Sequence, residues 1–556
     1  MKTLSLPLVF LLLPHFSFAQ APKNTSAPKT DECKISGIVV KLAGSEPLRK
    51  AHVYLRSADD DTRGISIVTG SDGRFQLKGL APGRYHLSVN RAGFVAQEYG
   101  QRKPEDPGAL LTLRPAQEVK DLLFRLIPSA IITGKILDED GEPLPEILVS
   151  ALRQVYLEGK RSLAAETTSQ TNDLGEYRLF GLRPGRYFVS AVFPQWSRFA
   201  GGDESEDAQP SQQGYAKMYY PGTPDAAKAI AVSVKSGEEI PSVEIFMRQL
   251  LVYRIRGHVY NQITHKAGRQ TNIFLTPKTK SREWTGDEHR NFVQKQDGAF
   301  EIVDVLPGSY FLTALWFDEG QSHTTSVPVE VGNADVEGIA ITIAPGIDIN
   351  GRIIWEGTPS IERDDLSIIL ESPEMRFSFG GSSHVMGNTF VIKGVSDGVY
   401  VPRVWGQGKD CYIKDVQYGG TSALEDGFTV NRAAVGTLEI TISSRGARIQ
   451  GAVADSDGLS AAGVHVVLVP DRSRRMQYRL YETQTTDQYG HFELRGIAPG
   501  DYQLFSWEDV ETGAWEDPEF LKPFEEKGEK IALQDGEQKT INLTAIRTKA
   551  PESPKP

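Results

Sequence analysis

Short stretches in which apolar and polar residues alternate recur along most of the chain. Residues 438–442 read Leu-Glu-Ile-Thr-Ile, and residues 122–126 read Leu-Leu-Phe-Arg-Leu. Alternation with a period of two is typical of β-strands that bury one face. The 53 glycines and 32 prolines supply turns between such strands and argue against a helical solenoid. The pattern therefore predicts an all-β protein.

One motif occurs five times. In its first copy, residues 72–85 read Asp-Gly-Arg-Phe-Gln-Leu-Lys-Gly-Leu-Ala-Pro-Gly-Arg-Tyr. The first aromatic residue and the last tyrosine are ten positions apart in every copy, at 75 and 85, 177 and 187, 300 and 310, 390 and 400, and 492 and 502. An Ile-x-Gly-x-(Val/Ile) run opens each copy, with its glycine at Gly37, Gly134, Gly257, Gly351 and Gly451. Equal spacings in five places indicate an internal repeat.

The period of the repeat sets the size of the folding unit. Successive opening glycines are 97, 123, 94 and 100 residues apart, which is the size of one antiparallel β-sandwich. We predict a linear array of five such sandwiches, at residues 34–128, 129–249, 250–345, 346–445 and 446–548. With strands of roughly ten residues at about 3.3 Å per residue, the extended array has a length on the order of 150 Å.

Folding alone explains the residues of the motif. Asp72-Gly73 predicts a tight hairpin turn, because glycine tolerates the positive φ of primed turns. Pro82-Gly83 suits a type II turn. Tyr85 follows that turn as in a tyrosine corner, in which the hydroxyl bonds backbone a few residues upstream. The regular residues therefore predict stability and not ligand binding.

The motif resembles that of the carboxypeptidase regulatory-like domain, and the resemblance extends over about residues 34–547. It implies Ig-like or prealbumin-like (transthyretin-like) sandwiches, in a group often placed with carbohydrate-binding-like folds. The fourth copy departs most, because Ser396-Asp397 replaces the x-Pro of the turn, and this puts its tyrosine corner in question. The array is also similar to uncharacterised secreted proteins of soil bacteria. The family name implies no peptidase activity.

The N-terminus predicts export. Lys2 precedes an apolar run over 4–13 and small residues near position 19, as in a signal peptide covering 1–21. The run is too short to span a bilayer, and we expect no membrane span after cleavage. Residues 22–33 are interpreted as a flexible leader and 549–556 as a disordered tail. The expected location is periplasmic or extracellular.

The charge and the cysteine content argue against a nucleic-acid-binding protein and against a disulfide-stabilised one. The net charge of −11 argues against a nucleic-acid partner, which would require a basic surface. Two cysteines cannot build a disulfide framework. Cys33 is placed in the leader and Cys411 in the fourth repeat, and we expect both to be free thiols.

The sequence contains no catalytic or metal-binding motif whose spacing and structural context fit its chemistry. No histidine has a glutamate three residues later, as a carboxypeptidase zinc site would require. Residues 394–398 match Gly-x-Ser-x-Gly, but Ser396 falls in a strand-to-strand turn of the repeat. The acidic runs 138–141 and 455–458 lack the spacing of a calcium loop and are interpreted as turns. We predict no catalytic residue, no metal and no cofactor.

An insert over 194–230 in the second repeat is the main irregularity. Its aromatic residues Trp196, Tyr219 and Tyr220 are candidate ligand-binding residues, because exposed rings stack on sugars or anchor partners. The alternative is that Tyr219 and Tyr220 fold back over a sheet edge.

Three functions are compared. The leading one is a non-catalytic exported binding or scaffold protein, with a polysaccharide or a cell-envelope protein as its partner. The second is a carbohydrate-binding accessory protein that recognises glycans through the loop aromatics. A secreted hydrolase is the remote third, since no catalytic constellation supports it.

Overall fold

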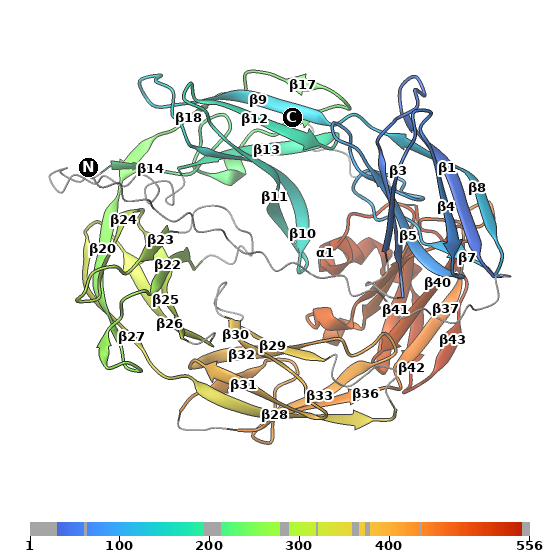
Figure 1. The fold of residues 1–556 in the computed structure, drawn as a ribbon. Coiled ribbons are helices and arrows are strands. Elements are labelled where there is room, and N and C mark those ends of the chain that lie inside the picture. The colour runs from blue at the N-terminus through green and yellow to red at the C-terminus, as the bar shows by residue number, and fades with distance from the viewer. Residues whose placement is uncertain are drawn as a thin grey trace, which may run out of the picture.

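The computed structural model describes residues 31–59, 64–193, 213–278, 289–318, 321–358, 366–372, 379–432 and 436–547. In this part of the chain the only α-helix is α1 (Pro518–Leu521), and strands form the rest of the framework (Figure 1). Short 3-10 helices cover Ala226–Lys228, Arg472–Arg474, Tyr478–Leu480, Ala514–Glu516 and Lys522–Lys527. The all-β prediction is confirmed. The predicted signal peptide and tail lie outside the described residues.

The first repeat, called unit 1, is a sandwich of two sheets. Its strands are β1 (Cys33–Lys41), β2 (His52–Ser57), β3 (Gly64–Val68), β4 (Arg74–Leu80), β5 (Gly83–Asn90), β6 (Gln97–Glu98), β7 (Leu111–Leu113) and β8 (Glu118–Leu126). One sheet has the order β4-β1-β8, and the other has the order β3-β2-β5-β6 with β7 also paired to β5. The opening and closing strands β1 and β8 pair in parallel, whereas the other pairs are antiparallel.

Units 2 and 3 follow the same plan. Unit 2 contains β9 (Ala130–Leu137), β10 (Leu148–Leu157), β11 (Lys160–Gln170), β12 (Glu176–Leu182), β13 (Gly185–Val192), β14 (Gln213–Tyr215), β15 (Met218–Tyr219), β16 (Val232–Val234), β17 (Glu239–Ile240), β18 (Ile245–Phe246) and β19 (Gln249–Leu251). Unit 3 contains β20 (Tyr253–Asn261), β21 (Lys266–Ala267), β22 (Asn272–Pro277), β23 (His289–Phe292), β24 (Ala299–Val305), β25 (Gly308–Asp318), β26 (Gln321–Val331) and β27 (Val336–Ile343).

Units 4 and 5 complete the chain. Unit 4 contains β28 (Ile347–Glu356), β29 (Ser367–Glu371), β30 (Phe379–His384), β31 (Thr389–Val395), β32 (Gly398–Trp405), β33 (Tyr412–Tyr418), β34 (Thr421–Ser422), β35 (Phe428–Val430) and β36 (Leu438–Ser443). Unit 5 contains β37 (Ala447–Ala454), β38 (His465–Pro470), β39 (Glu482–Thr485), β40 (His491–Ile497), β41 (Gly500–Trp507), β42 (Glu529–Leu533), β43 (Gln538–Thr540) and β44 (Leu543–Thr544). In each unit the two strands of the motif lie in opposite sheets, so the motif connects the two layers.

The opening glycine and the first aromatic residue of the motif are cross-strand neighbours in all five units. The register pairs Gly37 with Phe75, Gly134 with Tyr177, Gly257 with Phe300, Gly351 with Phe390, and Gly451 with Phe492. A Cβ built on Gly37 would lie 2.8 Å from the Phe75 ring and 2.3 Å from the carbonyl oxygen of Leu122. The aromatic ring therefore fills the place of the missing side chain, as aromatic residues do beside glycine in designed sheets.

The tyrosine corner is present in every unit. The hydroxyls of the five motif tyrosines donate to the carbonyl oxygen four residues upstream, over 2.8 Å for Tyr85, 2.9 Å for Tyr187, 2.8 Å for Tyr310, 3.1 Å for Tyr400 and 2.8 Å for Tyr502. The fourth copy keeps this geometry although Ser396 replaces the usual residue, because the acceptor is backbone.

Two details of the predicted motif are wrong. Asp72-Gly73 does not form a hairpin, since it connects β3 in one sheet to β4 in the other. Gly73 does have the expected positive φ of 72°, and a Cβ there would lie 2.7 Å from the carbonyl oxygen of Val39. Gly83 has φ of 156° and begins β5, so it is not the third residue of a type II turn, which needs φ near about +80°.

Five hydrophobic clusters each fall almost wholly within one repeat. Cys33, which we placed in the leader, is the first residue of β1 and is fully buried in the first cluster. A sixth cluster does not respect the repeats, because it joins Tyr156 of unit 2 to residues of unit 5 such as Trp507 and Trp515. The division at the five predicted boundaries stays a prediction.

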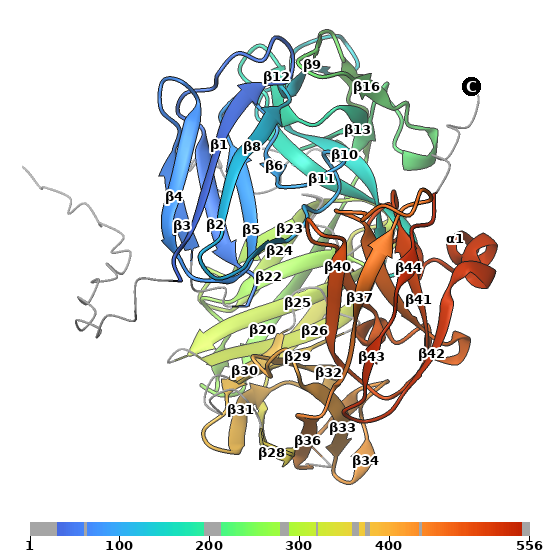
Figure 2. The same ribbon diagram turned by 90° about the vertical axis from the view of Figure 1, so that its right-hand side faces the viewer.

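The linear arrangement is wrong. Figures 1 and 2 show the units following one another around a closed circuit, with unit 1 beside unit 5. Arg84 of unit 1 donates to Glu493 of unit 5 over 2.7 Å, and Thr112 bonds Asp487 over 2.9 Å. The buried hydroxyl of Thr485 donates to the carbonyl oxygen of Gly108 over 2.7 Å. Complementary surfaces at the two ends of the chain therefore close the array into a ring.

Candidate functional site

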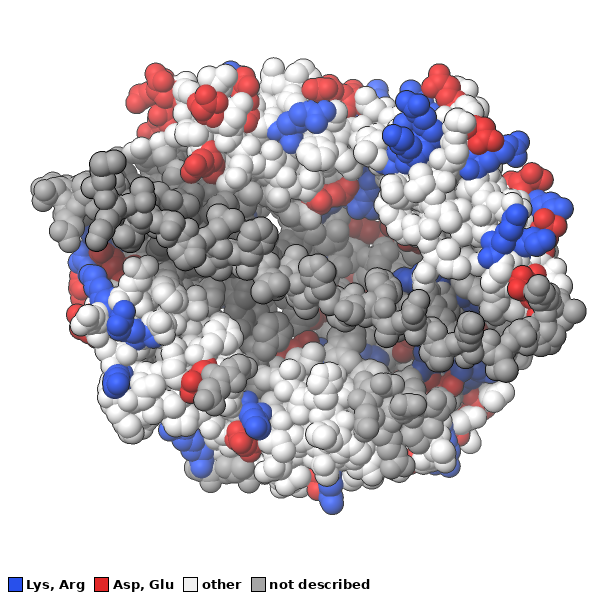
Figure 3. Space-filling model, in the orientation of Figure 1, with Lys and Arg blue, Asp and Glu red and all other residues white. Residues whose placement is uncertain are grey.

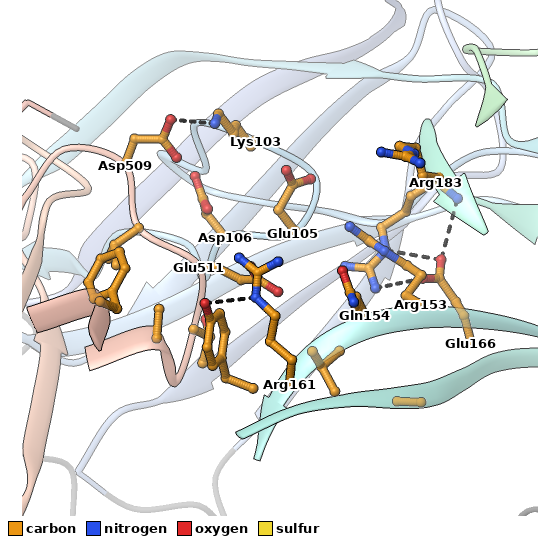
Figure 4. A pocket seen from close by; sticks show the side chains of 18 of the residues that line it. Lys103, Glu105, Asp106, Arg153, Gln154, Arg161, Glu166, Arg183, Asp509 and Glu511 are labelled. Carbon is orange, nitrogen blue, oxygen red and sulfur yellow. Dashed lines mark hydrogen bonds and ion pairs between the residues drawn. The ribbon is translucent and has the colours of Figure 1, made fainter. Parts of the chain in front are cut away.

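A pocket of about 660 Å³ lies where units 1, 2 and 5 meet (Figure 4). We call it the junction pocket. Its charged and amide-bearing lining consists of Lys103, Glu105, Asp106, Arg153, Gln154, Arg161, Glu166, Arg183, Arg186, Asp509 and Glu511. Its apolar lining includes Val155, Tyr156, Val510, Ala514, Phe520 and Phe524. None of the candidate residues predicted from the sequence lines it.

A long hairpin of unit 2 forms one wall. Strands β10 and β11 pair from Leu148–Gln170 down to Leu157–Lys160, and they extend toward unit 5 in Figure 1. The connecting residues Glu158 and Gly159 have φ of 48° and 68°, as a two-residue type I′ turn requires. A Cβ on Gly159 would lie 2.5 Å from the carbonyl oxygen of Glu516, so glycine also permits the contact with unit 5.

The tip of the hairpin is anchored in unit 5. Tyr156 is 8% exposed and packs in the sixth hydrophobic cluster. The hydroxyl of Tyr478 donates to the carbonyl oxygen of Glu158 over 2.9 Å. Our sequence analysis missed the hairpin, although a two-residue Glu-Gly turn between two strand-like runs is a signal that could have indicated it.

A second wall comes from a helical segment of unit 5. Asp517 accepts from the backbone nitrogen of Glu519 over 2.9 Å and caps α1, with Pro518 in the first turn. Phe520 and Phe524 from this segment pack against each other, with ring centroids 5.3 Å apart, and against Trp507. We missed this insert too, although Asp followed by Pro is a helix-start signal.

The arginine side of the pocket is built around Glu166 of β11. Arg183 donates to both of its carboxylate oxygens, over 3.0 Å from Nε and 2.9 Å from Nη2. The Tyr187 hydroxyl, which shares its one proton with the carbonyl oxygen of Arg183, lies 3.0 Å from the Glu166 carboxylate, and Arg153 lies 3.4 Å from it. Burial raises the pKa of the Glu166 carboxyl, but the bonds from Arg183 and Tyr187 outweigh burial and hold that pKa below its usual range. This network links the tyrosine corner of unit 2 to the pocket.

Arg161 is the arginine nearest the hairpin tip. Its Nε donates to the hydroxyl of Tyr156 over 2.9 Å, and its guanidinium carbon lies 5.2 Å from the centroid of the Tyr156 ring. Figure 4 shows Arg161 beside Glu511. The Tyr156 bond raises the pKa of Arg161, so the side chain carries a full positive charge at the pocket.

The carboxyl side comes from units 1 and 5. Asp106 is 7% exposed, and burial raises its pKa to about 6, with the charges of Glu105 and Asp509 adding to the rise. Burial likewise raises the pKa of Glu511. Lys103 pairs with Asp509 across the boundary between the two units. The pocket therefore brings arginines of one unit together with carboxyl groups of two others.

The rejected motifs behave as turns. Ser396 lies between β31 and β32, and its hydroxyl donates to the carbonyl oxygen of Thr324 in unit 3. The Asp138 carboxylate accepts from the backbone nitrogen of Asp140 and, over 2.8 Å, from that of Glu142. The Asp455 carboxylate accepts from the backbone nitrogen of Asp457 and, over 2.9 Å, from that of Leu459.

Cysteine and histidine side chains take no part in the junction pocket. Cys33 and Cys411 are both buried free thiols, as predicted. Within the described ranges, no group of three or more His, Cys, Asp and Glu residues could hold a metal ion. His465 is buried, and burial lowers its pKa to about 4.

The predicted ligand-binding aromatics lie elsewhere. Trp196 is outside the described residues. Tyr219 is half-buried in β15, which adds to the edge of a unit 2 sheet by pairing with β13, and Lys217 lies 5.5 Å above its ring. Tyr220 packs against the core of unit 2. Their role in ligand binding stays a prediction.

Charges on the described part of the face drawn in Figure 3 are mixed. In the view of Figure 3, Lys and Arg alternate with Asp and Glu around the rim. No described helix combines the length and the apolar character that a membrane crossing requires.

Comparison with family models supports the domain type of the first unit. Residues 34–119 match the model of the carboxypeptidase regulatory-like domain. No curated protein matches the chain. Among solved structures, the Bacillus anthracis TIE protein is 13% identical with a TM-score of 0.16, and the match covers 56% of this chain and 50% of that one. The chain thus spans half the length of that protein.

Two pilin structures are also similar. GBS52, a minor pilin of Streptococcus agalactiae, is 12% identical with a TM-score of 0.22, and the match covers 40% of this chain and 96% of that one. A streptococcal ancillary pilin is 14% identical with a TM-score of 0.19, and the match covers 57% of this chain and all of that one.

Proposed function

Because residues 34–119 form a carboxypeptidase regulatory-like domain, and the motif of that domain recurs four more times, we propose that the protein is an exported, non-catalytic scaffold. Its five units close into a ring that holds a ligand in the junction pocket. The expected location is the periplasm or the cell exterior, as the sequence of residues 1–21 indicates.

Ring closure is the observation that carries this proposal. Units 1, 2 and 5 each supply walls of the junction pocket, although residues 103 and 509 are 406 positions apart in the sequence. The pocket therefore exists only while the ends of the chain are held together. Proteins place small-ligand sites at such domain interfaces, in cavities of about 300–1,000 Å³.

Glycan recognition by Trp196, Tyr219 and Tyr220 is the alternative proposal. It predicts that retention on polysaccharide resins is lost in the double variant Tyr219→Ala/Tyr220→Ala. If the junction pocket holds the ligand, that variant binds as the unmodified protein does.

Small-angle X-ray scattering tests closure. The unmodified protein is expected to scatter as a compact ring. The variant Arg84→Glu places a carboxylate beside Glu493 and Asp59, the two present partners of Arg84, so like charges then repel at the boundary. We expect a larger radius of gyration, most clearly at low salt. The control Arg74→Glu changes an arginine that is 68% exposed and pairs only loosely with Asp72, 3.9 Å away, and should keep the ring closed.

Two results would overturn the proposal. An extended particle on the order of 150 Å for the unmodified protein would remove the ring, and with it the pocket. Turnover of peptides or glycosides by the purified chain would remove the non-catalytic assignment.

A further inference from the structure

The junction pocket separates charges by unit. The arginines Arg153, Arg161 and Arg186 all belong to unit 2, whereas Glu105 and Asp106 belong to unit 1 and Glu511 to unit 5. Lys103 pairs with Asp509, and Glu166 pairs with Arg183 and, over 3.4 Å, with Arg153. The cavity is thus lined by arginines of unit 2 and by carboxyl groups of units 1 and 5, which meet where Arg161 lies beside Glu511 (Figure 4).

Both walls keep capacity for a ligand. Arg161 uses its Nε for the bond to the Tyr156 hydroxyl, and Figure 4 shows its two terminal nitrogens pointing into the pocket. The carboxyl of Asp106 accepts from the backbone of Lys103, and Glu105 is exposed. A ligand with charge of one sign would be attracted by one wall and repelled by the other, whereas a dipolar ligand complements both.

The apolar lining indicates the body of the ligand. Sugar binding favours an aromatic ring with an open face. Here the guanidinium of Arg161 already lies over the Tyr156 ring. The centroid of the Phe524 ring lies 5.6 Å from the ammonium of Lys527 and 5.9 Å from the Trp507 ring, which meets it edge-on. Phe520 packs against Trp507 and Phe524. These rings offer edges that suit aliphatic side chains more than pyranose faces.

The size of the cavity limits the ligand further. About 660 Å³ is too small for a folded domain and lies within the range of small-ligand sites. The Gln154 amide on the same wall can both donate to and accept from a peptide group.

We propose that the junction pocket binds a short, apolar peptide that carries both an ammonium group and a carboxylate. The carboxylate lies against the arginines of unit 2, the ammonium lies against the carboxyl groups of units 1 and 5, and aliphatic side chains pack on Val510, Phe520 and Phe524. This inference rests on the proposed function, because it names the ligand class of the pocket that ring closure creates.

Isothermal titration calorimetry of the full chain at pH 7 tests this inference with four forms of one peptide. The probes are tri-leucine with free ends, its N-acetyl form, its C-terminal amide and the form blocked at both ends. We expect saturable binding of the free peptide and about tenfold weaker binding after each single block, since each removes one charge-assisted contact. The doubly blocked peptide should give no saturable heat.

Two variants test which end of the peptide contacts the arginines and which end contacts the carboxyl groups. In Arg161→Gln we expect weaker binding of the free peptide, and the free and amidated peptides should then bind equally. In Glu511→Gln the free and acetylated peptides should bind equally. A purely structural effect would weaken the binding of the free, acetylated and amidated peptides alike. Arg178→Gln, on a strand of unit 2 where Arg178 lies 5.8 Å from the Phe180 ring, is the control and should keep the full pattern.

The outcomes separate this inference from the proposed function. Equal binding of blocked and free peptides, or no binding of any of them, overturns the peptide assignment. Chitotriose or trigalacturonate binding that Arg161→Gln weakens would assign the pocket to charged or amide-bearing sugars instead, and the scaffold proposal would stand. If Arg161→Gln unfolds, the Glu511→Gln pattern alone decides, because Glu511 is exposed and its substitution should not disturb the fold.

Discussion

The repeated cores and the junction pocket are built on different kinds of partner. In each core the motif tyrosine bonds a backbone carbonyl, so unit 4 keeps the same corner with Ser396 where unit 5 has Ala498. At the junction many bonds join two side chains, as between Arg84 and Glu493 or Arg183 and Glu166. Backbone partners survive substitution, whereas side-chain partners do not. The same fold can therefore recur in five units with different side chains, whereas the pocket depends on particular side chains at one junction.

The largest expected effect breaks a repeated core. Tyr502 is 2% exposed, and Tyr502→Ala should lower the free energy of unfolding of unit 5 by about 3–5 kcal/mol as a large-to-small change. Tyr502→Phe keeps the ring and removes the hydroxyl with its bond to the carbonyl oxygen of Ala498, and should cost about 1 kcal/mol. Chemical denaturation followed by the fluorescence of Trp507 and Trp515 measures both. A melting curve of Tyr502→Ala that matches the unmodified protein would contradict the structural role of the motif.

The next effect tests the glycine and aromatic pair of the same core. A Cβ on Gly451 would lie 1.7 Å from the carbonyl oxygen of Ile541 and 3.1 Å from the Phe492 ring. We expect Gly451→Ala to cost about 3 kcal/mol, the upper end of overpacking, because the obstructing atom is backbone. Gly332→Ala is the control, since a Cβ there meets nothing within 4 Å. Equal denaturation midpoints for the two variants would refute the explanation that the opening glycine is required because an aromatic ring and a backbone carbonyl occupy the place of its side chain.

Local periodicity explains what could be predicted from the sequence. The all-β class, the five repeats and the tyrosine corners follow from residues such as Phe75 and Tyr85, whose partners lie in the same repeat. The failed details of the motif, such as the supposed hairpin at Gly73, arose because alternation shows which face a strand buries but not which sheet it joins.

The junction pocket could not be predicted in this way. Lys103 and Asp509 are 406 positions apart and belong to no shared period, so nothing local relates them. The individual elements did leave signals, namely the Glu158-Gly159 turn and the Asp517-Pro518 helix start. What they build together depends on the contact between the ends of the chain, which depends on how four successive linkers orient the units.

A smaller effect concerns the pH dependence of the junction. The pKa of Asp106 is raised to about 6 in the folded protein, above the value of about 3.9 in an unfolded chain. The folded state therefore binds this proton more tightly, and its contribution to stability is lost as the pH rises from about 4 to about 6. We expect a loss of about 1–2 kcal/mol over that window, measured as a fall in the midpoint of denaturation.

Substitution isolates this contribution. Asp106→Asn cannot ionise, so its stability should vary less between pH 4 and 6 than that of the unmodified protein. Asp72→Asn, in an exposed turn of unit 1, should leave the variation unchanged. An Asp106→Asn variant with the same pH dependence as the unmodified protein would show that the buried carboxyl does not titrate in this range.

The smallest effect separates closure of the ring from stability of the cores. The hydroxyl of Thr485 in unit 5 donates to the carbonyl oxygen of Gly108 in unit 1, and both groups are buried. Thr485→Val keeps the shape of the side chain and removes the donor, which should cost about 1 kcal/mol.

Because the acceptor belongs to another unit, the loss should appear as easier separation of units 1 and 5, with faster hydrogen exchange along β7 and β39 and no change in β37 or β40. Thr483→Val, an exposed position on the same strand, is the matched control. Faster exchange throughout unit 5 would instead mean that the bond supports the core, and the distinction between the repeated cores and the junction would fail at this boundary.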